Sequence, residues 1–406
     1  MTRRGRVPDR LAIEALRSGV PNDEAIRLLG SPDAYIEQQF RSLLDDENQP
    51  GFLVAGEFGT GKSHLLGYLR QVALLRNFAV SIVTISKETP LSISGVIYAA
   101  AIRNTRMQRI NDDTISHCLT RIEATQDAVR MLNDWASEPD SGLSPVFAAA
   151  LYLLNRAMKP DLRQQIEAFL AGGKPPLPTL RAALKDAGAR GMFDLAPVKP
   201  AELARQRLRF LPKLFQAAGF AGWVVMLDEV ELIGRYGPQQ RALAYAELAQ
   251  WLGLNAGLRV DGIRVIAAVS SDFAAEVINA RQDDERMPER LRLRGTPHLA
   301  ELALQAIRAI EGPVALPRLD DALLARNEAI VRRCYTEAYG WAAPAAEILP
   351  REASRTMRHH IRGWVMQWDM LRLRGIHTTV TTELAPTVYT QDDDLTLVPE
   401  GVEDPE

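Results

Sequence analysis

The sequence predicts an α/β protein in which a parallel sheet is covered by helices on both faces, giving three layers. One observation is a set of short apolar, β-branched runs of the kind found in strands that are buried on both faces. These runs are "GFLVA" (51–55), "AVSIVTIS" (79–86), "GWVVMLDEV" (222–230) and "IRVIAAVSS" (263–271). The other observation is that helical patterns such as "KSHLLGYLRQVALL" (62–75) separate the runs. Strands that alternate with helices in this way indicate a parallel sheet.

The remaining parts of the chain show helical spacing and suggest a domain organisation. Residues 1–45 carry short amphipathic helices, and residues 46–300 are expected to form the core. The stretch from about 100 to 220 is rich in Ala, Leu and Arg, and we expect it to be a helical insertion in that core. Residues 301–378 are expected to form a helical C-terminal lid domain, and residues 379–406 an acidic tail.

Composition and charge narrow the class of protein. Of the 406 residues, 47% are hydrophobic and 24% are charged, which suits a globular chain with a substantial core. Residues 392–406 hold seven carboxylates and no Lys or Arg, and without them the formal net charge of −3 becomes +4. The body is therefore mildly basic. An acidic tail of this kind is either solvated or an interaction segment.

The cysteines and the apolar runs indicate the cellular compartment of the protein. Cys118 and Cys334 lie far apart, without the spacing of a metal site, and are expected to be buried free thiols. The first residues are positively charged but lack the apolar segment of a signal peptide. The longest apolar runs fall short of the roughly 20 residues that cross a bilayer. We therefore expect a cytoplasmic protein without a membrane partner.

The stretch that follows the first strand run carries the strongest motif. It fits G-x-x-x-x-G-K-[ST], the Walker A pattern, with a strand before it and a helix after it. Glycines let backbone N–H groups approach phosphates, and the helix N-terminus favours negative charge. Lys62 is expected to reach the terminal phosphates and Ser63 to bind Mg²⁺. The predicted nucleotide-binding residues here are Gly56, Glu57, Phe58, Gly59, Thr60, Gly61, Lys62, Ser63 and His64.

Two acidic residues end the third strand run. Asp228 and Glu229 follow "WVVML", where a Walker B acid is expected at the carboxyl ends of the parallel strands. Asp228 is predicted to hold Mg²⁺, and Glu229 to orient and polarise the attacking water. With Lys62, these two residues form the predicted catalytic set. A strand that ends in two acids is also found where an acid caps the next helix, so the prediction depends on the Walker A motif.

A hydroxyl residue ends the next strand run. Ser270 is expected to lie between the two motifs and to sense the terminal phosphate. The alternative is that its hydroxyl caps the following helix.

An arginine-rich segment comes next. It has two open interpretations: an arginine that reaches the nucleotide of a neighbouring subunit, or a solvated helix whose arginines pair with its own acids. Its arginines are Arg281, Arg286, Arg290, Arg292 and Arg294, with four acids among them. Self-association into a homo-oligomer is expected under the first interpretation.

A second arginine cluster, with a single Glu, lies near the C-terminus. Its members are Arg351, Arg355, Arg358 and Arg362. Arg358 and Arg362 are four residues apart and so share one helical face. That face is expected to close over the nucleotide, to track a nucleic-acid backbone, or to be an ordinary charged lid helix.

Four segments together resemble the P-loop ATP-binding proteins of bacteriophage-exclusion (BREX) systems. They are "LAIEALRSGVPNDEAIRLLG", "LVAGEFGTGKSHLL", "TISKETPLS" and "VVMLDEVELI". The resemblance implies a three-layer P-loop NTPase of the AAA+-like type that works in bacterial antiviral defence beside a large helicase. Family members often have a Pro-Arg pair at the start of the lid helix. Here Met357 replaces the proline and Arg358 is retained, which leaves the nucleotide-sensing role of Arg358 open.

The sequence therefore predicts an ATP- and Mg²⁺-dependent ATPase of a phage-defence system. Turnover would be coupled to DNA or to a DNA-bound helicase partner, alongside other subunits of the system. An alternative from another class is a regulatory module that binds ATP with negligible turnover and scaffolds a defence helicase. A kinase is a weaker hypothesis, because no acceptor-binding site accompanies the loop.

Overall fold

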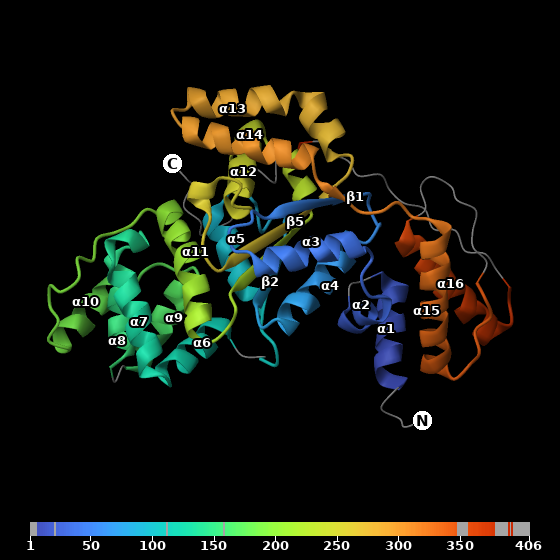
Figure 1. Ribbon diagram of the computed structural model, residues 1–406, viewed down its shortest axis with the longest axis horizontal. Coiled ribbons are helices and arrows are strands. Elements are labelled where there is room, and N and C mark those ends of the chain that lie inside the picture. Colours follow the sequence, from blue (N-terminus) through green and yellow to red (C-terminus); the bar gives the residue numbers. More distant parts are fainter. Residues whose placement is uncertain are drawn as a thin grey trace.

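A six-stranded sheet forms the centre of the protein in the computed structural model (Figure 1). The structure describes residues 6–19, 22–110, 113–156, 159–346, 356–377, 389 and 391–392, and the statements below concern these residues. The strand order is β3-β2-β4-β5-β1-β6, and all neighbouring strands are parallel except β2 and β3. The strands are β1 (Phe52–Gly56), β2 (Ala79–Thr84), β3 (Thr105–Arg106), β4 (Trp223–Asp228), β5 (Ile263–Ser270) and β6 (Val314–Ala315).

Both faces of the sheet are apolar because successive residues of a strand point to opposite sides. Val54, Val224 and Ile266 pack with α3 (Ala34–Asp45) and α4 (Lys62–Leu75) in one hydrophobic cluster. Their neighbours in the strands belong to a second cluster, on the other face, with residues of α5, α11 and α12. These helices are α5 (Ser94–Arg103), α11 (Pro200–Ala217) and α12 (Pro238–Trp251). The predicted α/β architecture with helices on both faces of a mainly parallel sheet is therefore confirmed.

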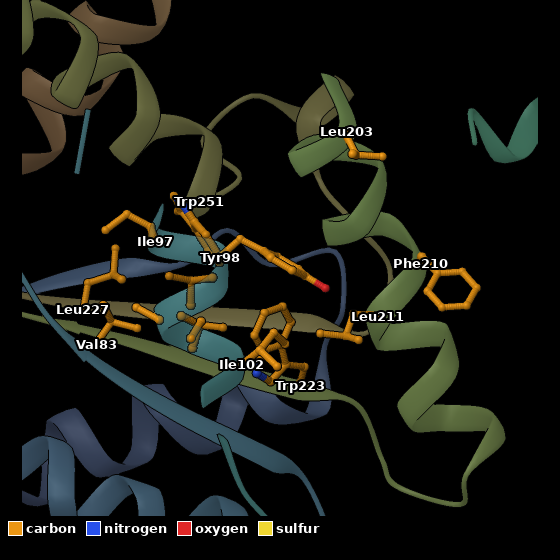
Figure 2. Packing of buried hydrophobic residues seen from close by; sticks show 14 of the residues in the cluster. Val83, Ile97, Tyr98, Ile102, Leu203, Phe210, Leu211, Trp223, Leu227 and Trp251 are labelled. Atoms are coloured by element: carbon orange, nitrogen blue, oxygen red, sulfur yellow. The ribbon is translucent and has the colours of Figure 1, made fainter. Parts of the chain in front are cut away.

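Trp223 joins the sheet to the helices of the second cluster (Figure 2). Its ring meets those of Tyr98, Phe215 and Trp251 edge-on, at centroid distances of 6.4, 5.9 and 6.3 Å. Its indole Nε1 donates to the Ser81 Oγ at 2.8 Å, so the one polar atom of the buried side chain is satisfied. Such edge-on aromatic contacts contribute roughly 0.5–1.5 kcal/mol each beyond area burial.

A helical lobe lies between β3 and β4 and forms the green part of Figure 1. Proline begins α8, α9 and α11, where its fixed φ suits a helix start and its missing N–H costs nothing. Phe147 lies 5.1 Å from both Phe169 and Phe210, centroid to centroid, at the centre of the lobe. Its further elements are α6 (Thr114–Glu123), α7 (Gln126–Ser137), η1 (Pro139–Ser141), α8 (Pro145–Leu154), α9 (Pro160–Leu170) and α10 (Leu177–Asp186).

The first and last helices of the chain pack together in a third hydrophobic cluster (Figure 1). Asp369 on the last helix accepts hydrogen bonds from the Arg17 Nε at 2.9 Å and from the Tyr335 Oη at 2.7 Å. Segments more than 300 residues apart therefore form one helical body. Its helices are α1 (Arg6–Ser18), α2 (Asp23–Leu29), α15 (Asp321–Tyr339) and α16 (Met357–Arg374).

The segments after β4 and β5 complete the second face. Arg241 on α12 and Asp283 at the start of α13 form a buried ion pair that holds α13 against α12. The elements are η2 (Val230–Arg235), η3 (Ala256–Leu258), η4 (Ala274–Asn279), α13 (Asp283–Leu293) and α14 (Pro297–Glu311). No helix in the described part of the chain has the length and apolarity to cross a membrane.

Candidate nucleotide site

The loop between β1 and α4 leaves its backbone uncovered. Gly59 and Gly61 have φ values of +78° and +112°, which residues with a β-carbon adopt only with strain. A β-carbon on Gly56 would lie 2.7 Å from the Thr60 Oγ1, so glycine is needed there for close packing. The Thr60 hydroxyl donates to the Glu57 carbonyl at 2.8 Å and closes the turn. The folded loop therefore leaves backbone groups uncovered by side chains at its glycines, next to the N-terminus of α4.

Lys62 is the first residue of α4, and its side chain is buried beneath the loop with 8% exposure. Its Nζ donates to the Gly56 carbonyl at 2.9 Å. The same Nζ lies 3.4 Å from the Glu231 Oε1. The ammonium is thus held by the protein itself at the base of the loop.

The acids at the end of β4 differ in environment. Asp228 is 6% exposed, and its Oδ1 accepts from the Glu229 N–H at 3.0 Å. Glu229 is more exposed than Asp228 but still partly covered, and it has a φ of +58°, uncommon for a residue with a β-carbon. Partial burial raises the pKa of the Glu229 carboxyl, and the neighbouring Asp228 charge raises it further. A raised pKa suits a carboxylate that has to accept a proton.

A cavity of about 350 Å³ brings the loop and the acids together. Phe58 to His64 line it from the loop, Asp228 and Glu229 from the end of β4, and Arg358 from α16. Gly56, Glu57 and Ser270 are not among the described residues that line it. Ser270 is buried, and it pairs with Gly56 in the register of β5 against β1, so it lies at the base of the loop.

The other end of the cavity is apolar and comes from both ends of the chain. Leu16, Ile26 and Leu29 line it from α1 and α2, and Leu323 and Ile361 line it from α15 and α16. None of these residues was predicted for the site. Local periodicity identifies the helices but not their meeting, which depends on packing between distant segments.

His64 ties this body to the loop. Its Nε2 lies 2.9 Å from the Gly30 carbonyl, the residue that caps α2, so Nε2 is the protonated nitrogen. Burial lowers the pKa of His64, which favours the neutral ring. His64 therefore has a structural contact with the end of α2, and its nucleotide-binding role stays a prediction.

The start of α16 packs on the loop. The Arg358 guanidinium carbon lies 5.5 Å from the centroid of the Phe58 ring, within cation–π range. A β-carbon on Gly59 would come within 2.6 Å of the Thr356 Oγ1, and Thr356 caps α16. Arg362 lies beside Gly19. Arg351 and Arg355 of the predicted cluster are outside the described residues.

The arginines after β5 are not among the described residues that line the cavity. Arg281 donates to the Gly234 carbonyl at 2.8 Å and to the Tyr389 carbonyl, within the same chain. The other four, Arg286, Arg290, Arg292 and Arg294, are exposed on α13 or at its end. The ion pairing with acids of the same helix, one of the two interpretations of this segment, is not seen among the described residues. Asp283, the first of these acids, pairs with Arg241 on α12.

Glu231 is a residue that the sequence did not single out. It lies in η2, three residues after Asp228, with its side chain 12% exposed and its Oε1 on Lys62. Its Oε2 is buried and has no hydrogen-bond partner in the described part of the chain. Burial raises the pKa of the Glu231 carboxyl. The signal that could have pointed to it is the third acid of "DEVE" (228–231), at helical spacing from the first.

The fold and cavity are compatible with a P-loop nucleotide-binding protein. Residues 10–292 match a family model described as "BREX system ATP-binding protein BrxC/D". The chain belongs to this ATP-binding family of phage-defence systems, which confirms the resemblance seen in the sequence. The match ends in α13, so α15 and α16 lie beyond it. No curated protein matches the chain.

Proposed function

We propose that the protein is an AAA+-like ATPase that binds ATP with Mg²⁺ in this cavity and hydrolyses it. The observation that carries the proposal is that Lys62, Asp228 and Glu229 meet at one cavity beside a bare backbone loop. The strand order supports the class, because β5, with Ser270 at its end, separates the loop strand β1 from the acid-bearing strand β4.

Each end of the cavity suits one part of ATP. Backbone N–H groups of residues 59–63 and the N-terminus of α4 would bind the phosphates, with Lys62 as the counter-charge. The apolar end, between α2 and α16, would enclose the base, as small-molecule sites usually enclose the apolar part of a ligand. Arg358 would complete the site from the lid side.

The residues present fit a magnesium ion that takes most of its ligands from phosphate and water. The Ser63 hydroxyl and the Asp228 carboxylate are oxygen ligands of the type that Mg²⁺ prefers. Within the described ranges no group of three or more His, Cys, Asp or Glu forms a complete metal site. Bound there, the ion would neutralise phosphate charge. Glu229 would orient water and accept its proton.

Substitution of the two named residues separates binding from hydrolysis. Lys62→Ala should abolish ATP binding, because the phosphates lose their buried counter-charge. Glu229→Gln should retain binding and lose turnover by about 10²-fold or more, because the amide cannot accept a proton. Equilibrium binding and steady-state ATPase assays measure the two effects. The exposed Lys185→Ala and Glu311→Gln are matched controls that should behave as wild type. Full turnover by Glu229→Gln would contradict the hydrolytic assignment.

ATP hydrolysis would be coupled to a partner of the protein. Membership of a BREX ATP-binding family supports a role beside other subunits of a defence system. DNA or a DNA-bound helicase as the coupled partner, and a homo-oligomer as the working form, are part of the proposal. ATPase rates measured with duplex DNA, single strands and RNA test the coupling. Stimulation by DNA supports a motor or clamp. A flat response with low turnover supports the alternative, a regulatory module that scaffolds a helicase.

A further inference from the structure

The buried contact between Lys62 and Glu231 has a consequence for nucleotide binding. The Lys62 Nζ lies 3.4 Å from the Glu231 Oε1, and the exposed fractions of the two side chains are 8% and 12%. At this depth the pair is screened far less than a surface ion pair. The only other partner of the ammonium in the described residues is the Gly56 carbonyl, at 2.9 Å. The Lys62 ammonium is therefore already in contact with two protein groups, the Gly56 carbonyl and the Glu231 carboxylate, before any phosphate binds.

The second oxygen of Glu231 shows that this contact is incomplete. Glu231 Oε2 is buried without a hydrogen-bond partner in the described part of the chain. Lys62 is the charged group that compensates this carboxylate, while Asp228 is a nearby like charge. A buried carboxylate with one oxygen unpaired is costly to keep, so a purely structural pair would be expected to satisfy both oxygens.

We propose that Glu231 is a positioning residue that latches Lys62 while the site lacks nucleotide, and so sets the affinity for ATP. The inference rests on the proposed function, because it assumes that Lys62 binds the phosphates. To do so the ammonium has to be shared with, or released by, Glu231. The nucleotide therefore competes with a carboxylate that is already in place, and its negative phosphates also approach that carboxylate.

The latch predicts that removal of the Glu231 charge tightens nucleotide binding. Glu231→Gln keeps the shape of the side chain and removes both the competitor and the repulsion. At the effective dielectric of such sites, a unit charge a few ångströms from the phosphates changes affinity by about tenfold or more. The gain should be largest for ATP with EDTA, since Mg²⁺ shields the phosphates. A metal-binding or structural role for Glu231 predicts the reverse, because loss of a ligand or of packing weakens binding.

The test is equilibrium binding of ATP to the full chain, with Mg²⁺ and with EDTA, for wild type, Glu231→Gln and Glu311→Gln. We expect Glu231→Gln to bind ATP about tenfold tighter with EDTA, and Glu311→Gln to match wild type. A second, ligand-free readout is thermal unfolding. Lys62→Ala leaves Glu231 buried and unpaired and should lower Tm, and Glu231→Gln added to Lys62→Ala should restore it.

The outcomes separate the two proposals. If wild type itself fails to bind ATP, the proposed function is overturned and the latch with it. If wild type binds ATP but Glu231→Gln binds equally or more weakly with EDTA, the latch alone is overturned. Additive effects of the two substitutions on Tm would also contradict it, because they would show that the two side chains are not coupled.

Discussion

At the scale of single residues, the phosphate loop depends on glycines for two different reasons. Gly61 needs only a left-handed backbone, since a β-carbon there would come no closer than 4.0 Å to the His64 Cβ. Gly59 needs both the backbone conformation and the space, because Thr356 at the start of α16 occupies the position that a β-carbon would take. Gly59 is thus a point of close contact between the loop and the start of α16.

Gly59→Ala should therefore disturb the site beyond its cost to the backbone. A β-carbon would come within 2.6 Å of the Thr356 Oγ1 and 3.0 Å of its Cβ, so the loop or α16 has to move. We expect ATP affinity to fall by about tenfold or more. Gly191→Ala is a matched control, because Gly191 has the same φ of +78° with nothing within 4 Å. Both variants should lose about 1 kcal/mol of unfolding free energy, but only Gly59→Ala should lose affinity. Equal affinities would show that the contact with Thr356 is unimportant.

At the scale of elements, a buried ion pair fixes α13 against α12. The Asp283 carboxylate accepts from the Arg241 Nε at 2.7 Å, the Arg241 Nη2 at 2.9 Å and the Tyr245 Oη at 2.8 Å. A pair that is bidentate and fully bonded tolerates burial, but loss of one partner leaves an uncompensated charge. The pair therefore holds the N-terminus of α13, the helix that carries the exposed arginines, against α12.

Asp283→Asn should destabilise the protein by about 3–5 kcal/mol, because the Arg241 charge stays buried without a carboxylate. Tyr245→Phe removes one hydrogen bond and should cost about 1–2 kcal/mol. Asp284→Asn, one residue along and exposed, is the control and should change little. Unfolding in urea measures all three. A loss below 1 kcal/mol for Asp283→Asn would mean that α13 is not anchored by this pair.

The sequence predicts those parts of the fold and the site that depend on local pattern. The strands β1, β2, β4 and β5 were recognisable because each is an apolar run, and the loop residues because their spacing is a phosphate-binding motif. The strands β3 and β6, of two residues each, are too short to leave such a pattern. The contact of Glu231 with Lys62 and the apolar end of the cavity could not be predicted, since both arise from packing that only the folded chain creates.

At the scale of the whole molecule, the cavity is lined by the loop at the edge of the sheet and by the helical body of α1, α2, α15 and α16. Figure 1 shows this helical body beside the sheet. The loop lines the end of the cavity where we propose that phosphates bind, while α1, α2, α15 and α16 contribute apolar residues. Because α2 and α16 line the cavity together with the loop, a nucleotide bound there would contact both the core and the terminal helices.

The measurement that tests the central claim most directly is a crystal structure of Glu229→Gln with ATP and Mg²⁺. We expect the triphosphate to lie against the backbone of residues 59–63, with Lys62 on the phosphates and the metal between Ser63 and Asp228. We also expect the base between Ile26 of α2 and Ile361 of α16. A nucleotide bound elsewhere, or a metal distant from both Ser63 and Asp228, would contradict the proposed function.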